Sequence, residues 1–553
     1  MSDASNAREQ AMLDAAAAGS EPRDSKKLSW SAGRGSFWVL LGASLLGVVP
    51  VWISAYPPMA DLPQHAAQVA LMRGLHNPSF AYGSLFRLNW FTPYLLGYSL
   101  IYVLAFVFGI LTACKIVISL FVVGFPLAAG LLLGSVAMDE FWAILCIPGV
   151  YGFAYQWGFL NFLITLPLGL LFLWFVLRHC EAWDWRGALV LAGSALALFF
   201  CHALICAFFC GCAAICLLAT ARTLETAAKR MLPLAAVLPV ALLWMRRTVS
   251  DPDTHKAMIW DLSWRYTVEP YYASLTEEPH NFAAGWGRAT GLFPRLLGLS
   301  PSWQHALLGI ALFLLPLCAG MRLHHRLTLW SPFLLCVAVL LFCPHAVFGT
   351  DYVYQRFTIF LVPFYLLLLR RSDLPRGRDI VVRCAALALV AVLIGLAARR
   401  ASVFSRETAG FQDALSHMQP GQRVLSLAFD HEDGVSIAPT FLHFPQWYAA
   451  QKQGMVDPSA AMMFPELVVY RKGDAPKAVL WDFEWSPEEF DWDDFSGWQY
   501  RYFVVRSPED LSPKLFAQAT CVVRQISHQG EWRLYENAAG CAPAGRAVTA
   551  PSR

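Results

Sequence analysis

The chain has 553 residues, of which 57% are hydrophobic and only 15% are charged. Soluble domains average about a quarter charged residues, so much of this protein's surface faces something other than water. The formal net charge of +3 is close to zero for this length and gives no support to a nucleic-acid partner. Together these values indicate an integral membrane protein.

The N-terminal 35 residues are rich in Ala, Ser and charged residues and have no periodic apolar face. We expect residues 1–35 to form a disordered cytoplasmic tail. The first apolar run, residues 37–55, is too long and too far from the N-terminus for a cleaved signal peptide. It is expected to remain as the first membrane helix.

A membrane-spanning helix needs about 20 mostly apolar residues. Twelve runs approach this length, and the neighbouring runs 187–201 and 203–219 are typical of a helical hairpin that pivots at His202. The runs are 37–55, 93–111, 116–136, 141–155, 159–177, 187–201, 203–219, 231–244, 305–321, 327–343, 357–369 and 380–398. The predicted transmembrane part covers residues 36–400.

Basic loops set the predicted orientation, because Lys and Arg accumulate on the cytoplasmic side of membrane helices. Lys26, Lys27 and Arg34 predict a cytoplasmic N-terminus, and basic loops near residues 178–186, 222–230, 322–326 and 370–378 are assigned to the same side. This places His202, the segments 246–303 and 344–356 and the C-terminal domain outside an inner, cytoplasmic membrane.

The number of crossings must then be odd, because an even number would return the C-terminus to the cytoplasm. One segment between residues 93 and 157 is expected to fail to cross or to hide an extra crossing. Residues 141–155 are the expected exception, since this run is short and contains Pro148-Gly149. The sequence thus predicts eleven or thirteen crossings.

The C-terminal part, residues 401–545, changes character and predicts a small extracytoplasmic α/β domain. Strand-length runs lie at 423–428, 478–481, 501–505, 521–527 and 532–535, with helical stretches near 407–418 and 508–518. Cys521 and Cys541 are the two cysteines of this part and would pair in an oxidising compartment. Residues 546–553 are expected to be a flexible tail.

Asp61 is the main candidate for chemistry. It follows the first membrane helix in the segment Tyr56-Pro57-Pro58-Met59-Ala60-Asp61, and Pro63 then opens an amphipathic stretch predicted to lie along the membrane surface. Asp61 could act as a general base near the membrane interface, with His65 one turn further on to orient it or contact substrate. The alternative is that Asp61 only helps to start the helix.

This arrangement resembles the GT-C glycosyltransferases, which use polyprenyl-phosphate-linked sugars and include the protein O-mannosyltransferases and the lipid A aminoarabinose transferases. The resemblance covers residues 36–400 in layout but only Asp61 and its surroundings at residue level. It implies a GT-C-like helical fold with an active site on the outer face and often a soluble C-terminal domain.

GT-C enzymes commonly have a second acidic residue on the next outer loop. The corresponding segment here, residues 155–161, offers Gln156 and Asn161 as substrate-binding candidates but no carboxylate, while Asp139-Glu140 lies nearby with its side undetermined. In the metal-dependent branch of the superfamily, those acids help to hold a divalent cation. Since this segment has no carboxylate, the resemblance does not firmly require a cofactor here. A divalent metal remains an option, with no metal ligands assigned.

Three further residues are candidates for substrate binding on the outer side. His202 lies at the outer end of an apolar run, and Lys256 lies in the longest outer loop. Arg356 stands where the chain re-enters the membrane, against the positive-inside trend, and a guanidinium can grip a lipid phosphate with two parallel hydrogen bonds. The alternative is that Arg356 extends toward the lipid headgroups and pairs with Asp351, with no role in substrate binding.

The predicted function is transfer of a sugar from a polyprenyl-phosphate donor to an extracytoplasmic acceptor by direct inverting displacement. The partners would be that donor, membrane lipids and an acceptor glycan, lipid or protein. Alternatives are an envelope polysaccharide polymerase or ligase, a lipid-linked glycan transporter, or a non-enzymatic assembly protein. The sequence does not distinguish the sugar, the acceptor or the oligomeric state.

Overall fold

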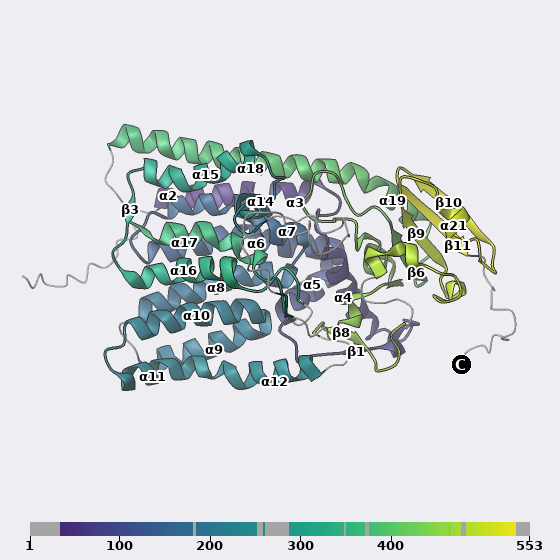
Figure 1. Cartoon of the computed structure of the whole chain (residues 1–553), viewed down its shortest axis with the longest axis horizontal. Coiled ribbons are helices and arrows are strands. Elements are labelled where there is room, and N and C mark those ends of the chain that lie inside the picture. The colour runs from purple at the N-terminus through teal and green to yellow at the C-terminus, as the bar shows by residue number, and fades with distance from the viewer. Residues whose placement is uncertain are drawn as a thin grey trace, which may run out of the picture.

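The computed structural model describes residues 34–180, 184–250, 258–259, 287–347, 350–370, 375–463, 465–476 and 483–537. A long bundle of helices leads at one end into a smaller region of strands and short helices formed by the C-terminal part of the chain (Figure 1). This confirms the predicted combination of an apolar helical part and a small α/β region. The predicted tails fall outside the described residues, except for residues 34–35.

The bundle is built from apolar helices of different lengths. They are α2 (Arg34–Leu46), α3 (Val49–Ile53), α6 (Ile110–Gly134), α8 (Leu160–His179), α9 (Trp185–Cys201), α10 (Ala203–Ala219), α11 (Leu224–Ala235), α12 (Val237–Ser250), α14 (Leu292–Leu297), α15 (Trp303–Cys318), α16 (Leu327–Phe342), η5 (Gln355–Phe360), α17 (Leu361–Leu367) and α18 (Arg376–Glu407). By length and composition, four helices of the described part could cross a membrane, or five if the bent pair α11 and α12 forms one span. Six further apolar helices are shorter.

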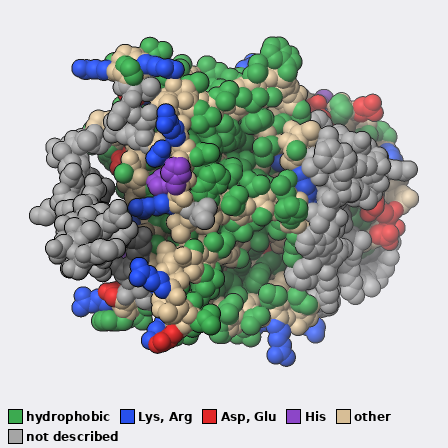
Figure 2. Space-filling model, turned by 60° about the vertical axis from the view of Figure 1, so that its left-hand side comes forward, with side chains coloured by type: hydrophobic (Ala, Val, Ile, Leu, Met, Phe, Trp, Pro, Cys, Tyr) green, Lys and Arg blue, Asp and Glu red, His purple; other side chains and the backbone are tan. Residues whose placement is uncertain are grey.

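The surface of the bundle is apolar over a wide area. Exposed side chains include Trp38, Leu189, Leu242 and Leu314. Figure 2 shows hydrophobic side chains across the middle of the molecule, with Lys, Arg and His side chains gathered toward its left edge. An apolar surface of this extent fits a lipid environment.

The predicted hairpin at His202 is present. His202 follows the last residue of α9 and precedes the first residue of α10, and its extended backbone makes the turn between them. The thiol of Cys206 reaches back to the carbonyl oxygen of Ala195 at 3.4 Å, which ties the two helices together.

Residues 141–155 do not form one helix. They belong to two 3-10 helices, η2 (Glu140–Cys146) and η3 (Pro148–Tyr151), and to the short helix α7 (Phe153–Trp157). Asp139, just before them, pairs with Arg383 of α18 at 2.6 Å, whereas the Tyr151 carbonyl accepts a hydrogen bond from Arg400 of the same helix at 3.4 Å. Because these arginines are about five turns apart, the segment advances about 25 Å along the bundle. The expected non-crossing segment therefore runs along the bundle, which corrects the prediction.

The predicted span 93–111 is the one that stays at one end. It forms α5 (Leu95–Phe108), which lies beside α4 (Leu62–Gly74). Tyr98 near its start hydrogen-bonds Glu466, and Phe108 at its end lines a cavity with Pro420 and Lys452. Both ends of α5 thus touch the C-terminal part of the chain. We call this end of the bundle the site end.

The helix after Asp61 is also placed differently from the prediction. α4 starts at Leu62 with Pro63 in its first turn, but ten of its thirteen residues are buried. It packs between α5 and α6 on one side and α20 (Trp447–Lys452) on the other. A C-terminal region that covers the helix explains why it does not lie along a membrane surface.

The C-terminal region has a five-stranded mixed sheet in the order β10-β11-β9-β6-β7. The strands are β6 (Arg423–Ala428), β7 (Met455–Asp457), β9 (Tyr502–Arg506), β10 (Val523–Gln529) and β11 (Trp532–Asn537), and the helices are α19 (Ala409–His417), α20 and α21 (Ser512–Leu515). β6 is parallel to β7 and β9, whereas β11 is antiparallel to β9 and β10. The predicted strand at 478–481 lies outside the described residues, and β7 was not predicted.

Three small strand pairs fasten loops of the bundle. β1 (Phe86–Leu88), from the loop between α4 and α5, pairs with β8 (Val468–Tyr470) of the C-terminal region. β2 (Met258–Ile259) pairs with β4 (Ala346–Val347), and β3 (Arg322–Leu323) pairs with β5 (Leu369–Arg370).

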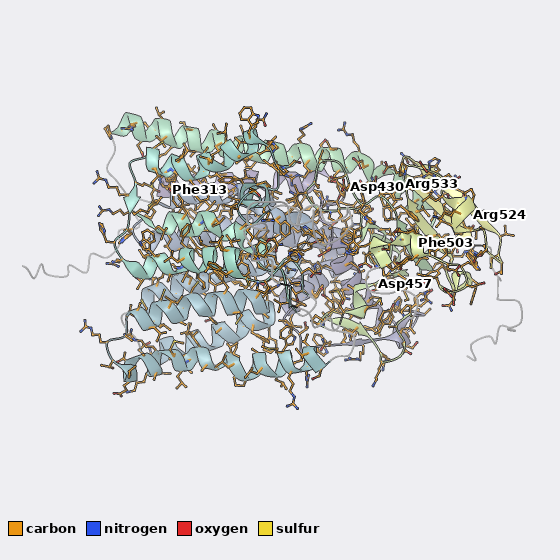
Figure 3. The ribbon with its side chains drawn as sticks, viewed as in Figure 1. Phe313, Asp430, Asp457, Phe503, Arg524 and Arg533 are labelled. Carbon is orange, nitrogen blue, oxygen red and sulfur yellow. The ribbon has the colours of Figure 1, made fainter. Side chains whose placement is uncertain are left out.

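The sheet shares its core with the bundle. Side chains alternate between the two faces of a strand. Val424 and Val504 join the hydrophobic cluster that continues through Phe404 into the bundle, whereas Leu425 and Phe503 face a second, separate cluster. Figure 3 labels Phe503 of this second cluster and Asp457 at the end of β7.

Candidate functional site

Asp61 is held at the site end by backbone contacts with the last two residues of α7. The amide of Ala60 donates to the carbonyl of Gln156 at 2.8 Å, and the amide of Asp61 donates to the carbonyl of Trp157 at 2.9 Å. Gly158 has φ +83°, and a Cβ at this position would lie 2.7 Å from the Asp61 nitrogen. Only glycine fits both that conformation and that close approach, so Gly158 helps to set the position of Asp61.

The Asp61 carboxylate does not cap the helix that it precedes. Asp61 occupies the N-cap position of α4 without a side-chain cap hydrogen bond. Its Oδ1 instead lies 3.4 Å from Nε2 of His443, and its side chain is 26% exposed. The carboxylate is therefore available for a role other than helix initiation.

His443 is the direct partner of Asp61 and comes from the C-terminal region. It lies just before the 3-10 helix η6 (Phe444–Gln446), and its Nδ1 is 3.4 Å from the side-chain nitrogen Nε2 of Gln64. Burial lowers the pKa of His443, but the hydrogen bond with Asp61 and the charges of Glu484 and Asp61 raise it above its usual value on balance. The contact with the Asp61 carboxylate therefore favours the protonated form of His443.

A second chain of contacts runs through His65. Its Nδ1 lies 2.8 Å from the Tyr98 hydroxyl, and that hydroxyl donates to Oε2 of Glu466. Burial lowers the pKa of His65 to about 4, whereas burial and the charge of Asp61 raise the pKa of Glu466 to about 7. His65 is therefore neutral at pH 7, and Glu466 changes its charge near that pH.

Arg356 faces the same site from the start of η5. It is buried, its guanidinium stacks 3.6 Å from the centroid of the Phe159 ring, and Nη2 donates to the backbone carbonyl of Asp351 at 2.7 Å. Among the described residues its Nε has no hydrogen-bond partner. The charge of Asp61 acts on the Arg356 guanidinium, which brings the two main candidates of the sequence analysis into one electrostatic environment.

Two more predicted residues join this site. The side-chain amide of Asn161 lies within hydrogen-bond reach of the Tyr98 hydroxyl, and its Oδ1 has no partner in the described part of the chain. His202 packs against the rings of Tyr94 and Phe162 at 5.5 and 5.4 Å, and the charge of Arg356 acts on it. We call the whole set the Asp61 cluster: Asp61, His65, Tyr98, Asn161, His202, Arg356, His443 and Glu466.

Gln156 is placed next to the cluster but is fully engaged. Its Nε2 donates to the carbonyls of Tyr151 and Gly298 at 3.2 and 2.7 Å, and its Oε1 accepts from the Ile437 amide at 2.7 Å. These contacts fasten the bundle to the C-terminal region. Its predicted contact with substrate remains a prediction.

The remaining predicted residues lie elsewhere or outside the described part. Lys256 and Cys541 are outside the described residues. Cys521 is in a disulfide bond, and the twelve cysteines of the helical part are free. Asp139 and its neighbour Glu140 lie far from Asp61 along the bundle, because Asp139 pairs with Arg383 near the start of α18. Glu466, not this pair, supplies the second carboxylate near Asp61.

Sequence reasoning missed Tyr98, His443 and Glu466. His443 and Glu466 stand beside apolar residues, as in Phe441-Leu442-His443-Phe444 and Pro465-Glu466-Leu467-Val468. The signal that could have found them is a titratable residue between apolar neighbours, because such a residue is expected to be buried. Buried ionisable groups gather at functional sites.

The described residues contain no group of three or more His, Cys, Asp and Glu side chains arranged to hold a metal ion. Asp61, Glu466 and the two histidines are oxygen and nitrogen donors of the right kind, but they are not gathered around one point. A divalent metal therefore has no assigned ligands here.

No protein-family model and no curated protein matches the chain. Among solved structures, the chain is similar to ArnT from Cupriavidus metallidurans bound to undecaprenyl phosphate, with 10% sequence identity and a TM-score of 0.45. The match covers 91% of this chain and 98% of that chain. At this TM-score we draw no functional argument from the likeness and base the function on the site itself.

Proposed function

We propose that the protein is a membrane glycosyltransferase of the GT-C type that uses a polyprenyl-phosphate-linked sugar. One observation carries the proposal: a partly exposed carboxylate, Asp61, and a buried guanidinium, Arg356, share one site between the bundle and the C-terminal region. A base and a cation in one site are what direct displacement of a phosphate leaving group requires.

Asp61 would act as the base. In this step the hydroxyl oxygen of the acceptor forms a bond to the anomeric carbon, and its proton passes to the Asp61 carboxylate. The bond from that carbon to the phosphate oxygen breaks, and the phosphate keeps the electron pair. Attack opposite to the leaving group inverts the configuration of the anomeric carbon.

Arg356 would hold the phosphate during this step. Its Nε is a buried donor with no partner among the described residues, so an oxyanion held at the guanidinium would supply the missing hydrogen bond. The bond to the Asp351 carbonyl and the stacking on Phe159 keep the group in place before the substrate arrives. A cation fixed in advance stabilises charge that grows on the leaving phosphate at little reorganisation cost.

His443 is a positioning residue in this scheme. Its Nε2 lies at Oδ1 of Asp61 and fixes one carboxylate oxygen, which leaves the other oxygen for the acceptor proton. The lipid-linked donor agrees with the apolar surface of the bundle.

The test is sugar transfer in proteoliposomes from a panel of polyprenyl-phosphate sugars by wild type, Asp61→Asn, Arg356→Ala and Arg356→Lys. We expect Asp61→Asn to lose roughly 10²–10⁴-fold in turnover. Arg356→Ala should lose about 10²–10³-fold, and Arg356→Lys should recover part of this loss because the charge is retained.

The matched control is Arg87→Gln, which removes an exposed cation from β1 in the same part of the molecule. It should transfer as wild type does. Undiminished transfer by Asp61→Asn would contradict the role of Asp61 as base. Failure of the wild type with every donor would contradict the proposed function.

A further inference from the structure

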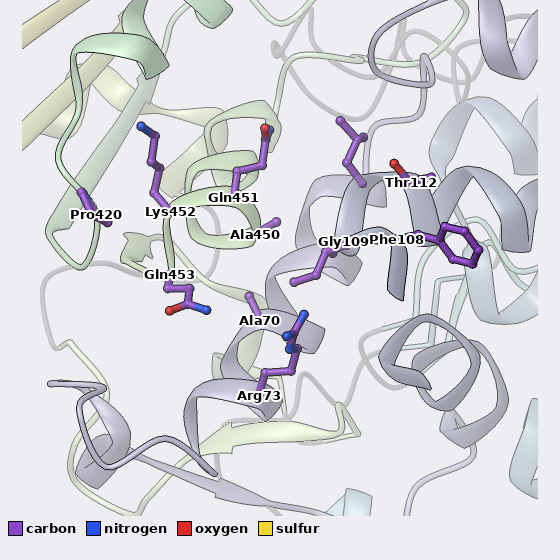
Figure 4. A pocket seen from close by; sticks show the side chains of 12 residues that line it. Ala70, Arg73, Phe108, Gly109, Thr112, Pro420, Ala450, Gln451, Lys452 and Gln453 are labelled. Atoms are coloured by element: carbon purple, nitrogen blue, oxygen red, sulfur yellow. The ribbon is translucent and has the colours of Figure 1, made fainter. Parts of the chain in front are cut away.

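A second site lies at the seam between α4, α5 and the C-terminal region. It is a cavity of about 590 Å³, lined among others by Arg73, Phe108, Thr112, Pro420, Lys452 and Gln453 (Figure 4). None of its lining residues belongs to the Asp61 cluster. The proposed transfer chemistry therefore gives this cavity no role.

Two cations border the cavity from opposite chain segments. Arg73 is in the last turn of α4, and Lys452 is the last residue of α20. In the described part of the chain neither has a carboxylate within salt-bridge distance. Arg73 donates from Nη1 to the Ala105 carbonyl at 3.1 Å, which leaves its other N–H groups for a ligand. The cavity is thus positively charged and suited to an anion.

An apolar surface continues from the cavity along α5. Val103, Phe106, Val107 and Phe108 have exposed fractions of 64%, 63%, 77% and 51%. The Arg73 guanidinium lies 5.2 Å from the centroid of the Phe106 ring, so the charged rim and the apolar face are in contact. Phe108 belongs to both.

This combination identifies the class of ligand. A free phosphate would use the two cations but not the apolar face, and a protein partner would not need a cavity between two cations. A lipid with an anionic headgroup uses both, because its phosphate meets the cations while its chain covers apolar side chains. Since α5 is an apolar helix that stays at the site end, a membrane around the bundle would bring its headgroup layer to this exposed face.

We propose that this cavity binds the headgroup of an anionic membrane phospholipid between Arg73 and Lys452, with the lipid chain on Val103, Phe106 and Val107 of α5. The proposal does not depend on the Asp61 chemistry, because it concerns different residues and is read out by binding. A lipid here would fill the seam between α5 and the C-terminal region.

The test is lipid retention by the detergent-purified full-length protein, measured by native mass spectrometry. The probes are phosphatidylglycerol, the zwitterionic phosphatidylcholine with the same chains, and inorganic phosphate. We expect wild type to retain phosphatidylglycerol over phosphatidylcholine. Arg73→Gln and Lys452→Gln should each weaken retention about fivefold, and the pair about 25-fold. Arg73→Lys should keep most of it.

Arg87→Gln is again the matched control and should bind as wild type does. Thermal unfolding of each variant separates lost binding from lost folding. Equal retention of the two lipids, or full retention of phosphatidylglycerol by the folded double variant, would overturn the proposal. If millimolar inorganic phosphate displaced bound phosphatidylglycerol as well as added lipid does, the cavity would be a site for free anions. That result would also overturn the proposal.

Discussion

At the residue scale, the Asp61 cluster holds titratable groups whose surroundings move their pKa values apart. Burial lowers the pKa of His65 to about 4, and burial together with the charge of Asp61 raises the pKa of Glu466 to about 7. The pKa of His443 is raised by its contact with Asp61 despite burial. Such opposite shifts within one small site are typical of acid and base assignments.

The raised pKa of Glu466 makes stability depend on pH. The folded protein binds the Glu466 proton more tightly than the unfolded chain does. The stabilisation of the folded state by this proton is therefore fully present below pH 4.5, the ordinary pKa of a Glu side chain. It is lost as the pH rises through about 7, the pKa of Glu466 in the folded protein. Up to about 3 kcal/mol of unfolding free energy is involved.

Glu466→Gln should remove this contribution, because a Gln side chain is neutral at every pH. We expect the unfolding temperature of wild type in nanodiscs to fall between pH 5 and pH 8 more than that of the variant. His65 changes stability with pH in the opposite direction, because its pKa is lowered in the folded state. Since both proteins contain His65, the difference between their curves reports on Glu466. Parallel curves for the two proteins would contradict the assignment.

At the element scale, α5 shows how an apolar run can fail to traverse the bundle. Its 14 residues extend about 21 Å, less than the roughly 30 Å of a hydrocarbon core. Gly109, with φ +74°, separates it from α6 and lets the chain change direction. Arg73 then bonds the carbonyl of Ala105 and holds α5 beside α4.

This placement of α5 predicts the side on which the end of α6 lies. With a cytoplasmic N-terminus, one crossing before α4 and none in α5, a reporter fused after Ser135 should be cytoplasmic. A fluorescent-protein fusion there should be bright and an alkaline phosphatase fusion inactive, while fusions after Phe80 should behave in the opposite way. An active phosphatase after Ser135 would mean that α5 crosses the membrane.

At the scale of the whole molecule, the C-terminal region and the bundle share one hydrophobic core. Phe404 of α18 stacks on Phe441 at 5.0 Å, and Tyr56 packs on Phe444 at 5.1 Å. The pairing of β1 with β8 adds a main-chain connection. The predicted domain 401–545 is therefore not separated from the bundle by a flexible linker.

This shared core has a consequence for the isolated C-terminal region. Residues 402–545 expressed alone would expose Phe411, Phe444 and Trp447 to water. We expect this fragment to aggregate or to unfold without cooperativity, as measured by light scattering and thermal circular dichroism. A soluble fragment with a sharp unfolding transition would show that the region is an autonomous domain.

Features that depend on local pattern could be predicted from the sequence alone. Runs of apolar residues predicted the helical bundle, and the hairpin at His202 follows from two such runs. Short apolar runs of strand length located four of the five strands of the C-terminal sheet. Asp61 was found because its position after the first apolar run is a local feature. Arg356 was found because a cation there departs from the charge pattern of its surroundings.

The side chains that meet Asp61 depend on contacts between distant parts of the chain. His443 and Gln64 are in contact across 379 residues of sequence, and Gln68 meets Val468 across 400. Composition does not encode such distant contacts, and it also cannot tell that α5 stays at one end while residues 141–155 run along the bundle. These outcomes depend on packing. The C-terminal region covers α4 and touches both ends of α5, and the Gln156 and Arg400 side chains donate to the Tyr151 carbonyl of η3.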